Sequence, residues 1–361
     1  MKKKTLKLLT SGMVLFTLMT GCTQEQPPMD PPAEVSTEKE EEPAAEPTKE
    51  PEAEPAVEET AAEEGIAAKD RSGNDITLPS EVESIISMSP ATTRALIDMG
   101  YGDKIVASDT NSQYSYGLEL ADDVLYMDMM APDQEQIVSL APDIVFTSGM
   151  SSTDGNDAYA NVRAAGLCVA DIPSSASIKD VEDDLLFIGK CIGDEEAAQG
   201  LVDEMEETIA TIKDIAATIP EDEKKTVLFE LFTPSADYPT IYTAGPGTYI
   251  NEMLELVGAV NIAGNEDAQW PALTEEAAVA ADPQVILSAD MYTPDVINTI
   301  LKMKGWENVT AIKNGAVFML NADEVNQPCH RIINALIDMA VSIYPEYYEY
   351  DEEAEELEPA A

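Results

Sequence analysis

The chain has 361 residues, and its 70 acidic and 20 basic side chains give a formal net charge of −50. This acidity argues against nucleic acid as a partner, because phosphate binding needs basic surface. The length suffices for two ordinary domains. A single histidine and no closely spaced cysteine pair exclude a histidine-rich zinc or manganese site. If the protein binds iron, the metal should arrive already chelated; a site made of carboxylates alone is the alternative, although the sequence has no motif for it.

Residues 1–21 have the pattern of a secretory signal, with four lysines before an apolar run from Leu8 to Met19. That run is too short for a confident membrane span. It ends in Leu18-Met-Thr-Gly-Cys22, which resembles a bacterial lipobox, where Cys22 supplies the thiol for a lipid. An ordinary signal with an incidental cysteine is the alternative. We expect a lipid on Cys22 to anchor the protein to the extracytoplasmic face of the cell membrane.

Residues 22–65 are rich in Pro, Glu, Ala and Thr and contain almost no large apolar side chain. Such a segment cannot bury enough surface to offset the entropy of ordering. Its like charges repel and its prolines stiffen it, so we predict a disordered, extended tether. A second acidic tail is predicted for residues 347–361.

Residues 66–193 alternate short apolar runs with helical patterns, which is typical of a parallel sheet covered by helices. The strands read as near-continuous apolar runs, as burial on both faces requires. This range is predicted to form an N-terminal α/β lobe. Its expected strands are Ser84–Met88, Lys104–Ala107, Val124–Met127, Asp143–Thr147 and Leu167–Ala170, and its expected helices are Ala91–Met99, Gln134–Ala141, Asp157–Ala165 and Ile178–Ile192.

One long helical pattern follows at residues 194–220, with apolar residues at spacings of three and four. The alternation then resumes over residues 221–346 as a C-terminal α/β lobe. The predicted fold class is α/β, with two lobes joined by one long helix and a ligand cleft at their junction. The second lobe is expected to contain strands Thr226–Phe232, Gln284–Ser288 and Ala316–Leu320, and helices Tyr249–Val257, Pro294–Lys302 and Ile332–Ile343.

Residues 135–150 and 276–291 repeat one pattern, 141 positions apart. In each copy an acid, Glu135 or Glu276, opens a short helical stretch. A proline ends that stretch seven residues later, and an apolar strand runs into a polar loop. A capping residue stands two places before each acid. Because the copies lie in different halves of the chain, they indicate two similar lobes.

Several stretches between Ile76 and Glu346 share an order and spacing with a known family. They are Ser87–Gly100, Pro132–Glu135 with Ala141–Asp143, Leu256–Asn261, Glu276 with Asp282–Pro283, Gly305–Trp306 and Tyr344–Glu346. Together they resemble the substrate-binding lipoproteins of bacterial ABC importers, in the class that carries ferric siderophores, cobalamin and haem. The resemblance implies two Rossmann-like lobes joined by a single helix that limits hinge opening.

The resemblance also implies a role for the repeated acids. Members of that family place one surface glutamate on each lobe, where it pairs with arginines of the permease subunits, and Glu135 and Glu276 match those positions. A matched pair of carboxylates suits a two-fold partner, because arginine–carboxylate pairing is strong and geometrically specific. The simpler explanation is that each acid only stabilises the N-terminus of its own helix, a contribution of roughly 0.3–1 kcal/mol. Glu275 could substitute for Glu276.

Ligand contacts are expected on loops that follow strands. Aromatic walls with a few polar groups suit a large chelate or ring. A basic residue such as Arg331 would suit a carboxylate or catecholate, although it could instead pair with Asp338 or Glu324. Trp270 could merely pack a loop, and His330 could occupy a surface helix position. The predicted ligand-binding residues are Ser89, Thr92, Ser148, Met150, Tyr242, Trp270, Met291, Tyr292, His330 and Arg331.

These patterns predict a monomeric binding protein, without catalytic residues or a cofactor of its own, that delivers a ligand to an ABC permease dimer. The expected ligand is a ferric siderophore first, cobalamin second and haem third. A surface enzyme on the same scaffold is the alternative, although the chain has no P-loop and no serine nucleophile elbow. The turn at Gly245–Thr248 could bind an anion, or it could simply start a helix. A scaffolding lipoprotein is a third option.

The cysteines other than Cys22 are Cys168, Cys191 and Cys329. A compartment outside the membrane permits disulfides, so Cys168 and Cys191 could pair. Buried free thiols are the favoured interpretation.

Overall fold

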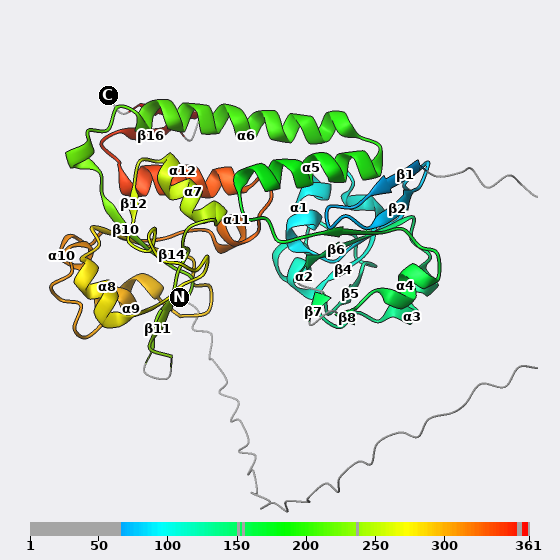
Figure 1. Ribbon diagram of the computed structural model, residues 1–361, viewed down its shortest axis with the longest axis horizontal. Coiled ribbons are helices and arrows are strands. Elements are labelled where there is room, and N and C mark those ends of the chain that lie inside the picture. Colours follow the sequence, from blue (N-terminus) through cyan, green and yellow to red (C-terminus); the bar gives the residue numbers. More distant parts are fainter. Residues whose placement is uncertain (1–65, 150–151, 154–155, 236–237, 352–355, 360–361) are drawn as a thin grey trace, which may run out of the picture. The chain divides into compact units, whose positions relative to one another are not determined.

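The computed structural model describes residues 66–149, 152–153, 156–235, 238–351 and 356–359, all within one compact unit from Ala61 to Ala361 (Figure 1). The predicted signal and tether, including Cys22, lie outside the described residues. Met150 lies outside them as well.

The N-terminal lobe contains a five-stranded parallel sheet in the order β5-β4-β3-β6-β9. The chain starts in β3, adds β4 and β5 on one side, and then returns to place β6 and β9 on the other side. The order of connection therefore reverses between β3 and β6. The strands are β3 (Ile85–Ser87), β4 (Ile105–Asp109), β5 (Leu125–Met127), β6 (Ile144–Ser148) and β9 (Val169–Ile172).

Helices cover both faces of this sheet, and short antiparallel pairs flank it. The predicted strands and helices of this lobe are present within three residues of their expected bounds, and the largest difference is the helix expected from Asp157, which starts at Ala160. The remaining elements are α1 (Pro90–Asp98), η1 (Gly102–Lys104), α2 (Thr110–Tyr116), α3 (Gln134–Leu140), α4 (Ala160–Ala164), β1 (Ile66–Lys69) with β2 (Asp75–Leu78), and β7 (Ser152–Thr153) with β8 (Asn156–Asp157).

Two helices, α5 (Ile178–Ile192) and α6 (Glu195–Ala216), lie side by side, and α6 runs along one edge of both lobes (Figure 1). Their close approach requires Gly189, since a Cβ there would lie 2.4 Å from the Cβ of Ala198. The start of α5 contacts the second lobe, because the N–H of Ile178 donates to Glu252 at 2.9 Å. The long helix predicted at residues 194–220 is therefore present, over Glu195–Ala216, and α5 packs beside it.

The C-terminal lobe contains a four-stranded parallel sheet in the order β12-β10-β14-β15, and its connection reverses between β10 and β14. Its sheet strands are β10 (Thr226–Glu230), β12 (Val260–Asn261), β14 (Val285–Ser288) and β15 (Val317–Met319), beside the antiparallel pair β11 (Thr240–Tyr242) and β13 (Ala272–Thr274). Its helices are η3 (Glu221–Glu223), α7 (Tyr249–Leu256), α8 (Glu275–Ala281), α9 (Val296–Leu301), α10 (Thr310–Asn314), α11 (Ala322–Asn326) and α12 (Ile332–Ile343).

The segment predicted as an acidic tail contains a hairpin, β16 (Tyr348–Asp351) paired with β17 (Glu356–Pro359). Tyr348 is buried, and its hydroxyl lies 3.2 Å from the carbonyl oxygen of Ile212 and 3.3 Å from that of Val257. One aromatic side chain thus ties an acidic segment to α6 and to the end of α7.

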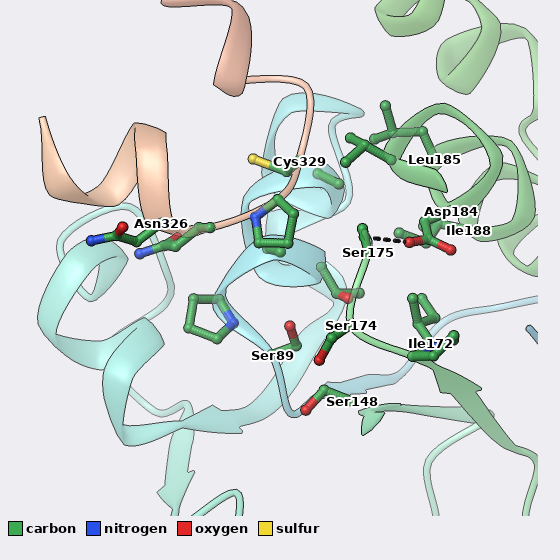
Figure 2. A pocket seen from close by; sticks show the side chains of 18 of the residues that line it. Ser89, Ser148, Ile172, Ser174, Ser175, Asp184, Leu185, Ile188, Asn326 and Cys329 are labelled. Atoms are coloured by element: carbon green, nitrogen blue, oxygen red, sulfur yellow. Dashed lines mark hydrogen bonds between the residues drawn. The ribbon is translucent and has the colours of Figure 1, made fainter. Parts of the chain in front are cut away.

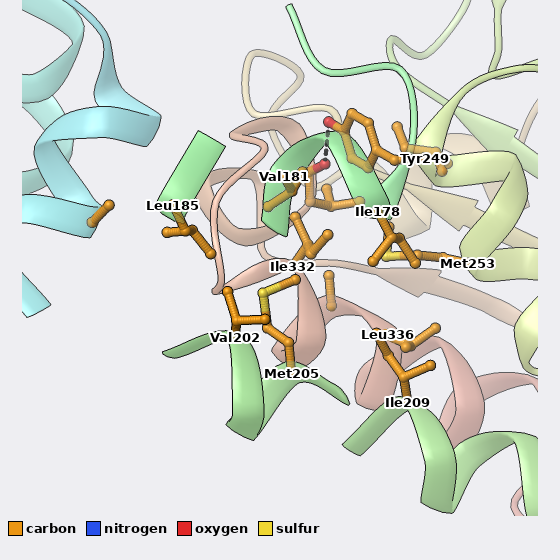
Figure 3. Packing of buried hydrophobic residues seen from close by; sticks show 14 of the residues in the cluster. Ile178, Val181, Leu185, Val202, Met205, Ile209, Tyr249, Met253, Ile332 and Leu336 are labelled. Atoms are coloured by element: carbon orange, nitrogen blue, oxygen red, sulfur yellow. Dashed lines mark hydrogen bonds between the residues drawn. The ribbon is translucent and has the colours of Figure 1, made fainter. Parts of the chain in front are cut away.

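The largest buried apolar cluster is continuous between the two lobes and includes α5, α6 and α12. In Figure 3, Ile209 of α6 lies against Leu336 of α12, and Met205 lies near Ile332. Two smaller clusters fill the opposite faces of the two sheets. Because burial contributes about 25 cal/mol per Å² of apolar surface, sharing one core resists separation of the lobes.

The predicted repeat is present at the level of backbone geometry. Both α3 and α8 begin at a capped residue and end at a residue in the left-handed conformation, Ala141 and Asp282, each with φ of 47°. Neither residue is glycine, so each copy keeps the same uncommon backbone conformation before its proline.

The repeat also extends to side-chain contacts that join neighbouring strand starts. In the first lobe, the N–H of Asp143 donates to Ser84 Oγ at 3.1 Å, and the N–H of Ser84 donates to Asp143 Oδ2 at 2.8 Å. In the second, Gln284 and Thr226 form the same reciprocal pair at 3.2 and 3.0 Å. The two lobes therefore share one local design, as the sequence predicted.

Candidate functional site

A cavity of about 230 Å³ lies at the carboxyl edge of the N-terminal sheet (Figure 2). Ser89, which follows β3, and Ser148, which ends β6, both line it. These strands are neighbours at the point where the order of connection reverses. In open α/β sheets this point is the usual place for a ligand.

The start of α1 supplies backbone donors to the cavity. Ser89 makes no side-chain cap, Pro90 has no N–H, and the first helical bond runs from Thr93 N to Ser89 O at 2.9 Å. The N–H groups of Ala91 and Thr92 therefore have no partner within the described chain, and both residues line the cavity. Free N–H groups at a helix start are suited to acceptor atoms of a ligand.

Ser148 adds a side-chain group to the same wall. Its Oγ is buried and has no hydrogen-bond partner among the residues that the structure describes. A buried hydroxyl left without a partner costs about 1–3 kcal/mol. Because Ser148 lines the cavity, a ligand or water atom placed there would satisfy it.

The opposite part of the wall comes from the C-terminal lobe, through residues 326–329, which comprise the last residue of α11 and the start of the loop that leads to α12. Figure 2 shows Asn326 and Cys329 on this segment, across from Ser174 and Ser175. Burial raises the pKa of the Cys329 thiol to about 12, so the thiol is neutral. Both lobes thus contribute to one cavity.

Asp184 is the carboxylate of the cavity wall, and it is paired. Arg71 Nε donates to its Oδ1 at 2.5 Å, and Ser175 Oγ donates to its Oδ2 at 2.8 Å. Burial raises the pKa of Asp184, although the contacts with Arg71 and Ser175 act in the opposite direction. The carboxylate and the guanidinium together leave this side of the wall without net charge.

Directly behind residues 326–329, charged side chains join the two lobes. Asp98 of α1 accepts hydrogen bonds from His330 at 2.7 Å and from Arg331 at 2.8 and 3.0 Å. Arg94 also pairs with Asp98, and its Nη1 donates to Glu119 at 2.9 Å. We call Arg94, Asp98, His330 and Arg331 the clasp.

The clasp places a well-ionised carboxylate between two elements of different lobes. Burial alone would raise the pKa of Asp98, but the hydrogen bonds from His330, Arg331 and Arg94 outweigh it and hold that pKa well below its usual value. Two further contacts run beside the clasp, from Ser115 to Asp323 and from Tyr116 to Gln327.

His330 and Arg331 were predicted to contact ligand, but neither lines the cavity. Their side chains are engaged by Asp98 instead, and Arg331 pairs with neither Asp338 nor Glu324 in the described chain. Sequence reasoning missed this partner because Asp98 lies 233 positions from Arg331. Of the predicted ligand residues, the cavity brings together Ser89, Thr92 and Ser148.

The predicted residues Tyr242, Trp270, Met291 and Tyr292 do not line the cavity. They lie on the C-terminal lobe, where between 42% and 73% of each side chain is exposed. Phe232, which the sequence analysis overlooked, stacks on Tyr292 with ring centroids 5.9 Å apart. Phe232 follows β10 and Tyr292 follows β14, so the stacked pair lies at the reversal point of the second sheet.

A buried acid ends the strand beneath this aromatic pair. Glu230 is fully buried at the end of β10, and neither carboxyl oxygen has a partner within the described residues. Burial, followed by the nearby charges of Asp290 and Glu275, raises the pKa of Glu230 to about 8. Asp290 contrasts with it, because hydrogen bonds from Thr293, Thr233 and Tyr292 outweigh burial and lower its pKa to about 2.

The two acids of the repeat lie at equivalent positions of the two lobes. Glu135 and Glu276 are both exposed at the starts of α3 and α8. Glu275 is half-buried and accepts a hydrogen bond from Trp306 Nε1 at 3.2 Å. Since each helix leads back to the start of the next parallel strand, its first residues lie toward the carboxyl edge of its sheet.

Three other features of the sequence have a place in the structure. Cys168, Cys191 and Cys329 are free thiols; Cys191 and Cys329 are buried, as expected, whereas Cys168 is half-buried. The Gly245–Thr248 turn starts α7, where Thr248 accepts a hydrogen bond from Asn251 N. Among the described residues, no three His, Cys, Asp or Glu side chains gather to hold a metal ion, and no helix has the length and apolar character to cross a membrane.

Comparison with known proteins decides the family. A family model described as periplasmic binding protein matches residues 85–324. The chain belongs to this family. An ABC transporter substrate-binding lipoprotein of Bacillus subtilis is 31% identical over 78% of this chain and 87% of its own length. A cobalamin-binding protein of Halobacterium salinarum is 29% identical over 76% of this chain and 73% of its own length.

A solved structure agrees with this assignment. A possible iron-binding, periplasmic solute-binding protein from Staphylococcus epidermidis has a TM-score of 0.62 and 26% identity, and the match covers 73% of this chain and all of the other. The chain is thus a substrate-binding protein of the ABC transporter class, with the two-lobed fold that the sequence predicted. The named relatives are binding proteins rather than enzymes.

Proposed function

We propose that this binding protein captures a metal chelate or corrinoid outside the cytoplasmic membrane and passes it to an ABC permease. The observation that carries the proposal is the cavity at the reversal point of the N-terminal sheet, where free N–H groups of Ala91 and Thr92 meet the unpartnered hydroxyl of Ser148. The relatives named for cobalamin and iron support this ligand class.

The cavity is smaller than such a ligand, so it would receive only one part of it. The exposed aromatic side chains at the carboxyl edge of the C-terminal sheet would cover another part, with the stacked Phe232 and Tyr292 as the central pair. Flat aromatic surface with few charges suits a rigid ring or chelate. Tyr242, Trp270 and Met291 keep the ligand-contact role predicted for them.

Attachment to the membrane completes the proposal. Cys22 would carry the lipid, and residues 23–65 would tether the folded lobes to the extracytoplasmic face of the membrane. The Bacillus subtilis relative is itself named a lipoprotein, which supports this expectation. Metabolic labelling with a fatty-acid analogue tests it, because Cys22→Ser should abolish incorporation.

Glu135 and Glu276 would then dock the loaded protein on the permease dimer. Both are exposed, they occupy equivalent positions in two similar lobes, and no hydrogen bond or ion pair within the described chain engages either carboxylate. Their free carboxylates are available to arginines of a partner. Glu275 is the weaker candidate, since Trp306 already engages it.

A thermal-shift titration tests the proposed function. Purified protein is mixed with cyanocobalamin, ferric siderophores of hydroxamate and catecholate type, and haemin. A specific ligand should add about 2.7 kcal/mol of stability at one hundred times its dissociation constant. Recovery of the ligand unchanged supports transport, whereas appearance of a product would favour the surface-enzyme alternative.

A further inference from the structure

The cavity wall contains no lysine, arginine or histidine. Each arginine of residues 66–359 is already paired with a carboxylate: Arg71 with Asp184, Arg94 and Arg331 with Asp98, and Arg163 with Asp157. His330, the sole histidine of the chain, is bound to Asp98 as well. A ligand in the cavity therefore meets no free positive charge from the described residues that form its wall.

The groups that the wall does offer are neutral donors. The free N–H groups of Ala91 and Thr92 lie at the start of α1, and the hydroxyls of Ser89 and Ser148 lie beside them. The helix start adds a partial positive charge, which is worth roughly 0.3–1 kcal/mol to an anion. This contribution is small beside the cost of burying a full negative charge without a cation.

From this wall we infer that the part of the ligand held in the cavity carries no net negative charge, and that it presents amide oxygens or metal-neutralised hydroxamate oxygens to the N-terminal lobe. The inference rests on the proposed function and narrows it. It favours a neutral corrinoid or a neutral or cationic hydroxamate chelate over tricatecholate chelates and haem. The net charge of −50 acts in the same direction, because it repels anions at longer range.

A matched pair of ligands isolates the charge. Cyanocobalamin and its monocarboxylic acid derivative differ only in that one amide is replaced by a carboxylate. Isothermal titration of both therefore measures the effect of one negative charge on affinity. Ferrioxamine B, a cationic hydroxamate chelate, and ferric enterobactin, a trianionic catecholate chelate, form a second pair. We expect the neutral or cationic member of the bound pair to bind at least tenfold tighter.

A variant supplies the converse test. Asn326 is exposed at the cavity wall, so Asn326→Lys should fold and place an ammonium beside the ligand, with Asn326→Gln as the matched control. In Asn326→Lys, the ratio between the dissociation constants of the anionic ligand and its neutral or cationic counterpart should fall at least threefold. Asn326→Gln should keep the wild-type ratio.

The outcomes separate the inference from the function on which it rests. Tighter binding of the anionic member by the wild-type protein would overturn the inference and leave the proposed function standing. An unchanged preference in Asn326→Lys would overturn the assignment of that preference to this wall. Binding of haemin but of none of the four compounds would overturn the inference and leave the proposed function standing. Absence of binding by all four compounds and by haemin would remove the proposed function, and the inference with it.

Discussion

Asp98 on α1 and Arg331 beside α12 are joined from one lobe to the other by two hydrogen bonds of 2.8 and 3.0 Å. The pair lies immediately behind residues 326–329, which form one wall of the cavity. The same carboxylate also holds Arg94 and His330. A basic residue expected to hold an anionic ligand is therefore used to fix the position of a cavity wall.

Replacing Asp98 with asparagine should destabilise the protein, because it leaves Arg94 and Arg331 without their shared carboxylate. We expect a loss of roughly 2–4 kcal/mol in the free energy of unfolding, measured by urea denaturation. Asp75→Asn is the control, since its ion pair with Lys69 is exposed and should matter by less than about 1 kcal/mol. Equal losses in both variants would refute a structural role for the clasp.

Ionisation of Asp98 should also make the free energy of unfolding depend on pH. The pKa of Asp98 in the folded protein is held below the value of 3.8 that it has without partners. The stabilisation by the ionised carboxylate is therefore fully present above pH 3.8, and it is lost as the pH falls from there through the lower folded-state pKa. The stability difference between wild type and Asp98→Asn should accordingly narrow between pH 5 and pH 2. A gap that stays constant over this range would show that ionisation of Asp98 does not stabilise the fold.

Glu230→Gln should stabilise the protein increasingly as the pH rises from about 4.5 to about 8. Folding raises the pKa of this carboxyl from 4.5 to about 8, so over that range the unfolded chain releases a proton that the folded chain keeps. Each pKa difference of one corresponds to about 1.4 kcal/mol, so the gain should reach a few kcal/mol by pH 8. Urea denaturation at pH 4.5 and pH 8 checks it, and equal effects at both pH values would contradict it.

Reversing the charge of both proposed docking acids should separate ligand binding from uptake. In Glu135→Lys with Glu276→Lys, transport of the bound ligand into cells should be abolished while the dissociation constant stays unchanged. The matched control reverses two exposed acids of α6, Glu204→Lys with Glu207→Lys, and should keep transport. Normal uptake by the first double variant would remove the docking proposal.

Much of the architecture could be predicted from the sequence, because periodicity and caps are local. The helices Ile178–Ile192 and Ile332–Ile343 match their expected bounds, and the repeat around Glu135 and Glu276 is present in both lobes. Helix α2 was missed, since its sequence is polar and its start depends on two N–H groups donated to Asp109.

The site was only partly predictable, because its contacts join distant parts of the chain. Ser89 and Ser148 follow strands, and that rule alone brought both to the cavity. The clasp could not be found in this way, since a single sequence contains no sign that Asp98 and Arg331 meet. The position of Tyr348 was not predicted either. Its segment was expected to be an acidic tail from its composition, but Tyr348 is buried and contacts α6.

Isothermal titration of wild type and Ser148→Ala with the chelate that gives the largest thermal shift tests the central claim, that a ligand occupies the cavity between the lobes. We expect one ligand per protein and at least fivefold weaker binding in the variant, because the ligand loses the hydroxyl that the cavity leaves unpartnered. Unaltered affinity in Ser148→Ala, with the fold intact by circular dichroism, would place the ligand elsewhere and contradict the account.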